Sequence, residues 1–117
     1  MRKLRPFVFE NSIVPKIISI FAPVSVYAVA FGPFTWYRGK AHPAIKNHEN
    51  IHFFQQLELL FVFQWILYGL FWLIGLIKYK STVLAYAENP FEKEAYLNQE
   101  NLNYLDQRRW FSWWRYL

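Results

Sequence analysis

Apolar residues alternate with small ones over residues 24–31, and the run ends at Gly32-Pro33 before an aromatic stretch at 34–37. Alternation with a period of two, interrupted by a glycine–proline pair, predicts two short strands joined by a turn. The apolar residues before them, 13–23, contain Lys16 and two prolines, which disfavour a membrane-spanning helix there. The pattern therefore predicts an N-terminal β-hairpin, either purely structural or with an edge that pairs with an extended peptide.

A long helix is predicted to follow the polar loop at residues 38–42. Pro43 suits a first helical turn, and no glycine or proline follows it before Gly69. Residues 59–77 form an apolar run of 19 residues without a charge, which is long enough to cross a bilayer. Two lysines follow the run within three residues.

A second, more polar helix is predicted near the C-terminus. Asn89 is a good helix cap and Pro90 suits the first helical position, so the helix should run from there to about Asp106. The last residues, 108–117, mix arginine with tryptophan. That mixture is typical of a membrane interface.

The composition strengthens the membrane interpretation. Hydrophobic residues make up 55% of the 117 residues and aromatic residues 22%, and Trp and Tyr favour membrane interfaces. The net charge of +5 suits anionic lipid head groups. The basic residues are scattered between apolar runs and match no nucleic-acid-binding motif, so no nucleic-acid partner is expected. The length predicts a single domain over residues 1–117, and the absence of cysteine excludes thiol chemistry.

The first predicted helix carries an H-E-x-x-H motif at residues 48–52. Residues four apart lie on one face of a helix, so His48 and His52 can bind one zinc ion. Glu49 is placed to accept a proton from a water molecule bound to that ion. The alternative is a chance match on an amphipathic helix. His42 precedes a proline, which pushes it out of the helical region, so it is expected to be an ordinary loop histidine.

A catalytic zinc site needs a third protein ligand and an open position. No third histidine has the metzincin spacing, which leaves downstream acidic residues as candidates: Glu58, Glu88, Glu92, Glu94, Glu100 and Asp106. Glu58 lies six residues beyond the second histidine, about 9 Å along the helix, which is too far. Glu92 is the best candidate, because Ala95 shares its helical face and would let the two helices pack closely. The alternatives are a helix-capping role for Glu92 and a solvent-exposed position for Glu94.

The two motifs, H-E-x-x-H at residues 48–52 and E-x-x-A at residues 92–95, resemble those of the gluzincin metallopeptidases, including the membrane-integrated enzymes of the CaaX-prenyl-protease type. The resemblance implies that Glu92, on a second helix, is the third zinc ligand. Those enzymes usually have an aspartate after the alanine, where this chain has Tyr96. Tyr96 lies one turn beyond Glu92 and is a candidate to stabilise an oxyanion.

A single membrane span is incompatible with Glu92 as a ligand. One straight helix from His52 to Tyr79 would be about 40 Å long, which would place Glu92 on the far side of the bilayer. An extended return through the hydrocarbon would leave backbone polar groups unpaired. A helical hairpin that turns near Tyr68-Gly69 removes the conflict, with an apolar tip about half a bilayer deep. A soluble core or a dimer that buries this hairpin is the alternative.

Taken together, the sequence predicts a mainly α (α+β) fold: a short β-hairpin, a long motif helix that continues into an apolar helical hairpin, and a C-terminal helix with the third ligand. His48, His52 and Glu92 would bind Zn2+, and Glu49 would be the general base and then acid. The expected function is zinc-dependent hydrolysis of a peptide or membrane-proximal protein segment at the membrane surface. The alternative is a non-catalytic, membrane-anchored hairpin protein with an interaction role, in which the motif is fortuitous, degenerate or binds zinc structurally. The oligomeric state stays open.

Overall fold

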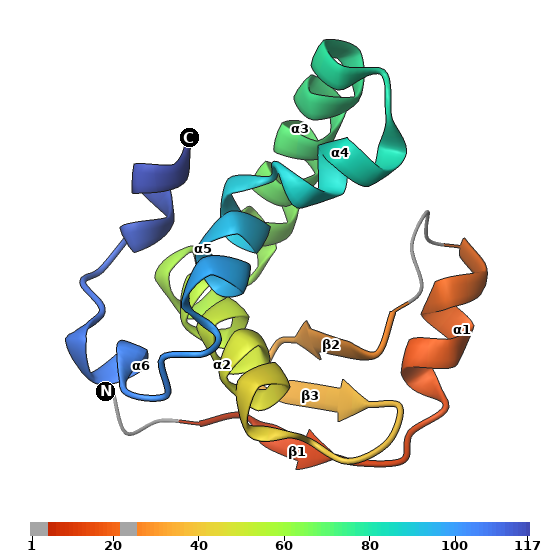
Figure 1. Ribbon diagram of the computed structural model, residues 1–117, viewed down its shortest axis with the longest axis vertical. Coiled ribbons are helices and arrows are strands. Elements are labelled where there is room, and N and C mark those ends of the chain that lie inside the picture. The colour runs from red at the N-terminus through yellow and green to blue at the C-terminus, as the bar shows by residue number, and fades with distance from the viewer. Residues whose placement is uncertain (1–4, 22–25) are drawn as a thin grey trace.

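The protein is mainly helical, with a small sheet, as predicted. The computed structural model describes residues 5–21 and 26–117. The N-terminal part consists of β1 (Phe7–Phe9), α1 (Val14–Phe21), β2 (Ala28–Phe31) and β3 (Phe34–Tyr37). The rest consists of α2 (Pro43–Glu58), α3 (Val62–Tyr79), α4 (Thr82–Ala87), α5 (Pro90–Asn98), α6 (Tyr104–Gln107) and the 3-10 helix η1 (Ser112–Tyr116). The sheet lies at one end, and α3 and α4 extend away from it (Figure 1).

The sheet has the strand order β1-β3-β2. The predicted hairpin is confirmed: β2 and β3 pair antiparallel from Ala28 opposite Tyr37 to Phe31 opposite Phe34. Gly32 in the turn has a φ of 57°, a conformation that suits glycine. Two elements of this region were not predicted. They are β1, which pairs parallel with β3, and α1, which lies in the proline-containing run before the hairpin.

The predicted turn near Tyr68-Gly69 is wrong, because α3 is one unbroken helix of 18 residues. The chain reverses earlier, between α2 and α3, where Leu60 and Phe61 have φ values of 54° and 62°. The Phe61 N–H donates to the Gln56 carbonyl at 2.6 Å and closes this turn. Leucine and phenylalanine seldom adopt a positive φ, so the sequence offers no sign of the turn. With the reversal here, α3 runs back beside the motif helix.

An apolar helical hairpin does form, with its turn at the other end of α3. Lys80 adopts the left-handed conformation at the C-terminus of α3, and the Ser81 side chain accepts from the Leu84 N–H at the start of α4. Gly75 lets α4 approach closely, since a Cβ there would lie 3.1 Å from the Ala85 Cα. The turn at Lys80 brings the chain back toward α2.

The C-terminal helix is shorter than predicted, since α5 ends at Asn98 and not at about Asp106. The Asn47 side chain on α2 donates its Nδ2 hydrogens to the carbonyl oxygens of Asn98, Gln99 and Asn101, at distances of 2.9–3.2 Å. These bonds satisfy the last carbonyls from outside the helix, so the chain can leave the helical path there.

The core lies where α2 packs against α5. Ile51, Phe54 and Ala95 are among its buried residues, and Ala95 has no exposed surface. The C-terminal tail was expected at an interface, but Trp113 is buried, with its ring centroid 4.9 Å from that of Phe91. Other aromatic residues of the tail are exposed, so the tail is divided between the core and the surface.

The helix α3 is long and apolar enough to cross a membrane. Of its 18 residues, only Gln64 and Gly75 are buried. The rest of the described chain is globular, and α3 packs against α2 and α4 along one of its sides.

Candidate metal centre

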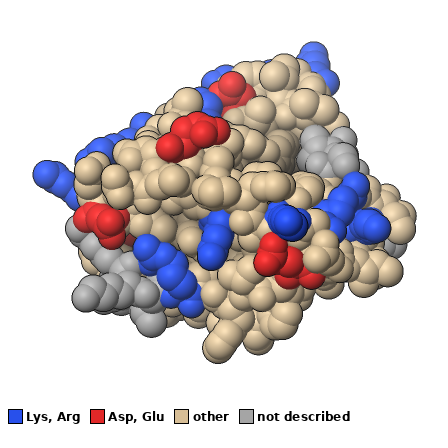
Figure 2. Space-filling model, turned by 60° about the horizontal axis from the view of Figure 1, so that its bottom comes forward, with Lys and Arg blue, Asp and Glu red and all other residues tan. Residues whose placement is uncertain are grey.

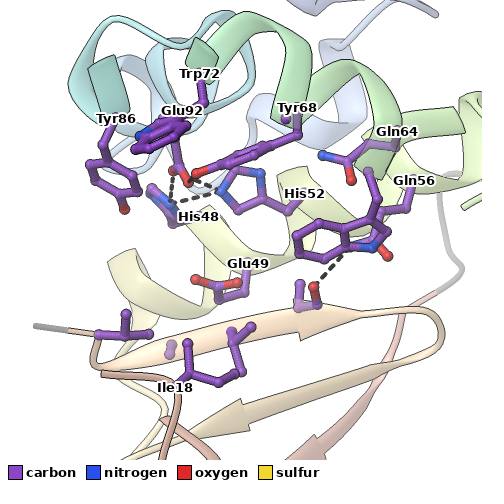
Figure 3. A pocket seen from close by; sticks show the side chains of 16 residues that line it. Ile18, His48, Glu49, His52, Gln56, Gln64, Tyr68, Trp72, Tyr86 and Glu92 are labelled. Atoms are coloured by element: carbon purple, nitrogen blue, oxygen red, sulfur yellow. Dashed lines mark hydrogen bonds and ion pairs between the residues drawn. The ribbon is translucent and has the colours of Figure 1, made fainter. Parts of the chain in front are cut away.

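Three residues predicted as ligands meet in the structure. His48 and His52 project from α2 and Glu92 from the first turn of α5 (Figure 3). The two histidine Nε2 atoms lie 3.1 Å apart, and Glu92 Oε1 lies 3.2 Å from that of His48 and 3.0 Å from that of His52. Ligand atoms in a tetrahedral zinc site with bonds of about 2.0–2.1 Å lie about 3.3 Å apart. All three residues are buried, and the group could hold a metal ion.

The position of Glu92 follows from how α5 begins. The Asn89 Oδ1 accepts from the Phe91 N–H at 3.1 Å and caps the helix, which leaves Glu92 free to point at α2. Its second oxygen, Oε2, accepts from the Tyr68 hydroxyl at 2.8 Å. The small Ala95 lets α5 lie close to α2, as the sequence predicted. Glu92 therefore binds the histidines and a tyrosine, and the alternative of a capping role is wrong.

Hydrogen bonds on the far side of each imidazole orient the pair. His52 Nδ1 lies 2.8 Å from Gln55 Oε1, and His48 Nδ1 lies 2.9 Å from Gln99 Oε1. Gln55 Nε2 donates to the Phe91 carbonyl and to a second carboxylate, which fixes the orientation of its amide group. Its Oε1 can only accept, so His52 Nδ1 carries the hydrogen and the neutral ring presents a lone pair at Nε2.

The centre needs a cation. With both imidazoles neutral and oriented in this way, two nitrogen lone pairs and a carboxylate oxygen face one another within 3.2 Å. Burial lowers the pKa of His52, but the Glu92 carboxylate outweighs burial and raises that pKa to about 9. Burial raises the pKa of Glu92, and the two histidines outweigh it and hold that pKa well below its usual range. A proton or a metal ion satisfies this set of acceptors, and the donor types fit zinc.

Glu49 lies one residue after the first histidine, and its carboxylate points into the cleft between α2 and β2 (Figure 3). It is 5% exposed. Burial raises its pKa, and the nearby histidines act in the opposite direction. Glu49 is thus a buried carboxylate beside the three-residue group and open to the same cavity.

The cleft is a cavity of about 380 Å3 between β2, α2, α3 and α4. Its walls are mostly apolar and aromatic, with Trp65 and Trp72 on the α3 side. Gln56 joins α2 to the end of β2: its Nε2 donates to the Ala30 carbonyl at 3.1 Å, and its Oε1 accepts from the Gly32 N–H at 2.8 Å. β2 is an edge strand of the sheet, so its outer side lies along the cavity.

A buried ionic network lies behind the centre. Arg108 donates to Glu94 at 2.6 and 3.1 Å and to Glu58 at 2.8 and 2.9 Å, and all three side chains are at most 4% exposed. Glu94 also accepts from Gln55 Nε2 at 2.9 Å, which connects the network to His52. The alternative of a solvent-exposed Glu94 is wrong, because α5 is covered on this side by the chain that follows it.

Two other predictions concern the surroundings of the centre. His42 is exposed at the start of α2 and lies outside the group, as expected. The Tyr96 ring centroid lies 4.4 Å from that of His48, but its hydroxyl lies 2.8 Å from the Tyr86 hydroxyl. Tyr96 does not line the cavity, whereas Tyr68 and Tyr86 do; the Tyr68 hydroxyl is bonded to Glu92, which leaves that of Tyr86 as the second tyrosine hydroxyl of the cavity wall.

Sequence reasoning missed the residues that support the ligands. Gln55 lies three residues after His52, a helical spacing that could have identified it. Tyr68 and Tyr86 come from helices whose places depend on the two chain reversals, and no local pattern identifies them.

Comparisons with models of protein families, with curated proteins and with solved structures find no match for this chain.

Proposed function

We propose that this protein is a small, membrane-associated zinc metallopeptidase of gluzincin type. The observation that carries the proposal is the convergence of two imidazole nitrogens and one carboxylate oxygen within 3.2 Å, beside the carboxylate of Glu49. Two histidines and one glutamate with an open side are a ligand set of catalytic zinc sites, whereas Mg2+ and Ca2+ prefer oxygen ligands throughout. Bound there, zinc would polarise a peptide carbonyl and acidify a water molecule.

The chain's own residues supply the proton transfers. Glu49 accepts a proton from the attacking water and then donates it to the leaving nitrogen of the peptide. Burial raises its pKa toward the range in which a carboxylate can perform both tasks. The Tyr86 hydroxyl, held by that of Tyr96 at 2.8 Å, is placed at the cavity to donate a hydrogen bond to the oxyanion.

The substrate is a peptide or a membrane-proximal protein segment that binds in extended form. The outer edge of β2 borders the cavity, and Gln56 fixes the end of that strand. Backbone groups at such an edge can pair with an extended peptide, which brings its carbonyl groups past Glu49. The apolar cavity walls favour large apolar side chains in that peptide. The protein would work at the membrane surface, with α3 in contact with lipid.

To test this, a tryptic digest of cell protein is incubated with the zinc-loaded protein. Mass spectrometry then identifies the new peptide ends. Glu49→Gln should bind zinc as the wild type does and cleave at least about 100-fold more slowly, because the proton acceptor is lost. Glu88→Gln is the matched control, since Glu88 pairs with Lys93 at the surface. Equal cleavage by the wild type and Glu49→Gln, or no cleavage by the wild type, would contradict the proposal.

A further inference from the structure

Two exposed apolar faces border the cleft. On the first, Ile13, Ile17 and Ile20 are 65%, 47% and 76% exposed. Their spacing of four and then three residues places them on one side of α1 and the residue before it. Ile18 lies on another side of α1 and lines the cavity. This helix thus forms one wall of the cleft and presents an uncovered aliphatic stripe outside it.

The second face runs along α3. Its exposed side chains follow helical spacing over the whole helix: Val62, Ile66, Leu70, Leu73 and Ile77, each 48–77% exposed. The opposite side of α3 lines the cavity with Trp65, Tyr68 and Trp72. α3 is therefore apolar both on the side that lines the cavity and on the side that faces solvent.

The helices that carry the two faces form opposite walls of the cleft. In Figure 1, α1 and the α3–α4 pair rise on either side of β2, with the cleft between them. Figure 2, turned to bring the bottom of that view forward, shows lysine, arginine and acidic side chains spread over that face. Two apolar helices that project from the sheet, on a molecule with charged side chains elsewhere on its surface, suit a protein that rests on a membrane.

Basic residues flank both apolar faces. Lys16 is exposed on α1 beside the isoleucine stripe, and Lys78 is exposed at the end of α3. Long lysine side chains can keep their stems against lipid while the ammonium groups reach anionic head groups. A second copy of this chain, with its own net charge of +5, would bring like charges together at these positions. The charges therefore favour an anionic bilayer as the partner of both faces.

We propose that α1 and α3 rest together in one leaflet of an anionic bilayer, so that the mouth of the cleft opens onto lipid. A peptide then reaches β2 from the membrane, and the substrate class is an apolar, membrane-embedded segment. The contact with the bilayer rests on the two apolar faces and on the basic residues beside them. The substrate class rests on the proposed peptidase function.

The first experiment locates the two faces. The chain has no cysteine, so single cysteines can be placed at Ile20 and Leu73, with Lys46 and Glu100 as exposed controls, and labelled with the fluorophore NBD. With phosphatidylcholine–phosphatidylglycerol vesicles, the labels at 20 and 73 should shift to the blue and be quenched by spin-labelled lipid. Labels at 46 and 100 should not change. A label at 20 that stays in water while the label at 73 enters lipid would overturn the proposal, as would no lipid quenching at either position.

The second experiment tests the route of the substrate. A peptide with an apolar segment anchored in the vesicles is compared with the same cleavable sequence made soluble by removal of that segment. Ile20→Asp should slow cleavage of the anchored peptide at least about tenfold by removing α1 from the lipid, and should leave zinc content and cleavage of the soluble peptide unchanged. Leu102→Asp, at a similarly exposed leucine, should have no effect. If Ile20→Asp and Leu102→Asp cleave the anchored peptide at equal rates, the proposed route is contradicted. If the wild type cleaves neither peptide, the peptidase function is contradicted, and the result of the labelling experiment still stands.

Discussion

Replacing Gln55 with leucine should weaken metal binding while the fold is kept. Gln55 has no exposed surface, and its Oε1 lies 2.8 Å from His52 Nδ1. Above about pH 9, where metal-free His52 is neutral, the ring hydrogen of the Gln55→Leu variant can lie on Nε2, where the Glu92 carboxylate accepts it at 3.0 Å. Metal binding at Nε2 would force that hydrogen back to Nδ1, where the leucine offers no acceptor.

The cost of this change is that of one buried, unsatisfied donor, about 1–3 kcal/mol. At about 1.4 kcal/mol for each factor of ten, zinc affinity should fall by about 5- to 150-fold. Effects of about 10- to 100-fold are usual when the hydrogen-bond partner of a metal-binding histidine is removed. Gln99 offers a matched control, because it bonds His48 Nδ1 in the same way but is partly exposed. Water can replace its amide oxygen, so Gln99→Leu should lose less than about fivefold.

The assay is competition for zinc with a chromophoric chelator, with circular dichroism as the check that each variant is folded. The expected order of affinity is wild type, then Gln99→Leu, then Gln55→Leu. A folded Gln55→Leu protein with wild-type affinity would refute the reasoning. So would a larger loss in Gln99→Leu, since it would mean that the exposed amide, and not the buried one, orients the histidines.

Three further predictions concern charge and packing. Arg108→Met should lower the free energy of unfolding by about 3–5 kcal/mol, measured by urea denaturation, because it leaves two buried carboxylates without their cation. At pH 7.5, zinc binding should release about one proton per chain into a weakly buffered indicator solution, because His52 has a pKa of about 9 without metal; no release should occur above pH 10. In the metal-free protein, protonated His52 contributes fully to stability below about pH 6.5, and this contribution is lost as the pH rises through 9. Gly75→Ala should destabilise the protein by about 1–3 kcal/mol, because its Cβ would lie 3.1 Å from the Ala85 Cα, whereas Gly69→Ala, with open space around it, should stabilise it by about 0.5–1 kcal/mol. Equal midpoints of these two variants in urea would contradict the packing argument.

The parts of the fold that the sequence predicts are those with local signals. Gly32-Pro33 marks the hairpin turn, and Asn89 with Pro90 marks the start of α5. The helical spacing of the two motif histidines places them on one face of α2, and the need for a third ligand identifies Glu92. Each of these inferences uses residues within one turn or one helix.

The parts that could not be predicted depend on distant contacts. The reversal before α3 uses Leu60 and Phe61 in a conformation that neither residue favours, so Gly69 was the more natural candidate for a turn. The end of α5 is set by Asn47, about 50 residues earlier in the chain. The burial of Glu94 depends on Arg108, which reaches it from beyond the end of its helix. Charge and periodicity along the chain carry no sign of such partners.

We propose that His48, His52 and Glu92 bind one zinc ion. The most direct test is the metal content of detergent-purified protein, measured by inductively coupled plasma mass spectrometry for the wild type, Glu92→Ala and the surface control Glu88→Ala. The wild type and the control should hold close to one zinc per chain, and Glu92→Ala should lose it or bind it much more weakly. A wild-type protein that takes up no zinc when zinc is supplied, or a Glu92→Ala protein that keeps it undiminished, would contradict the account.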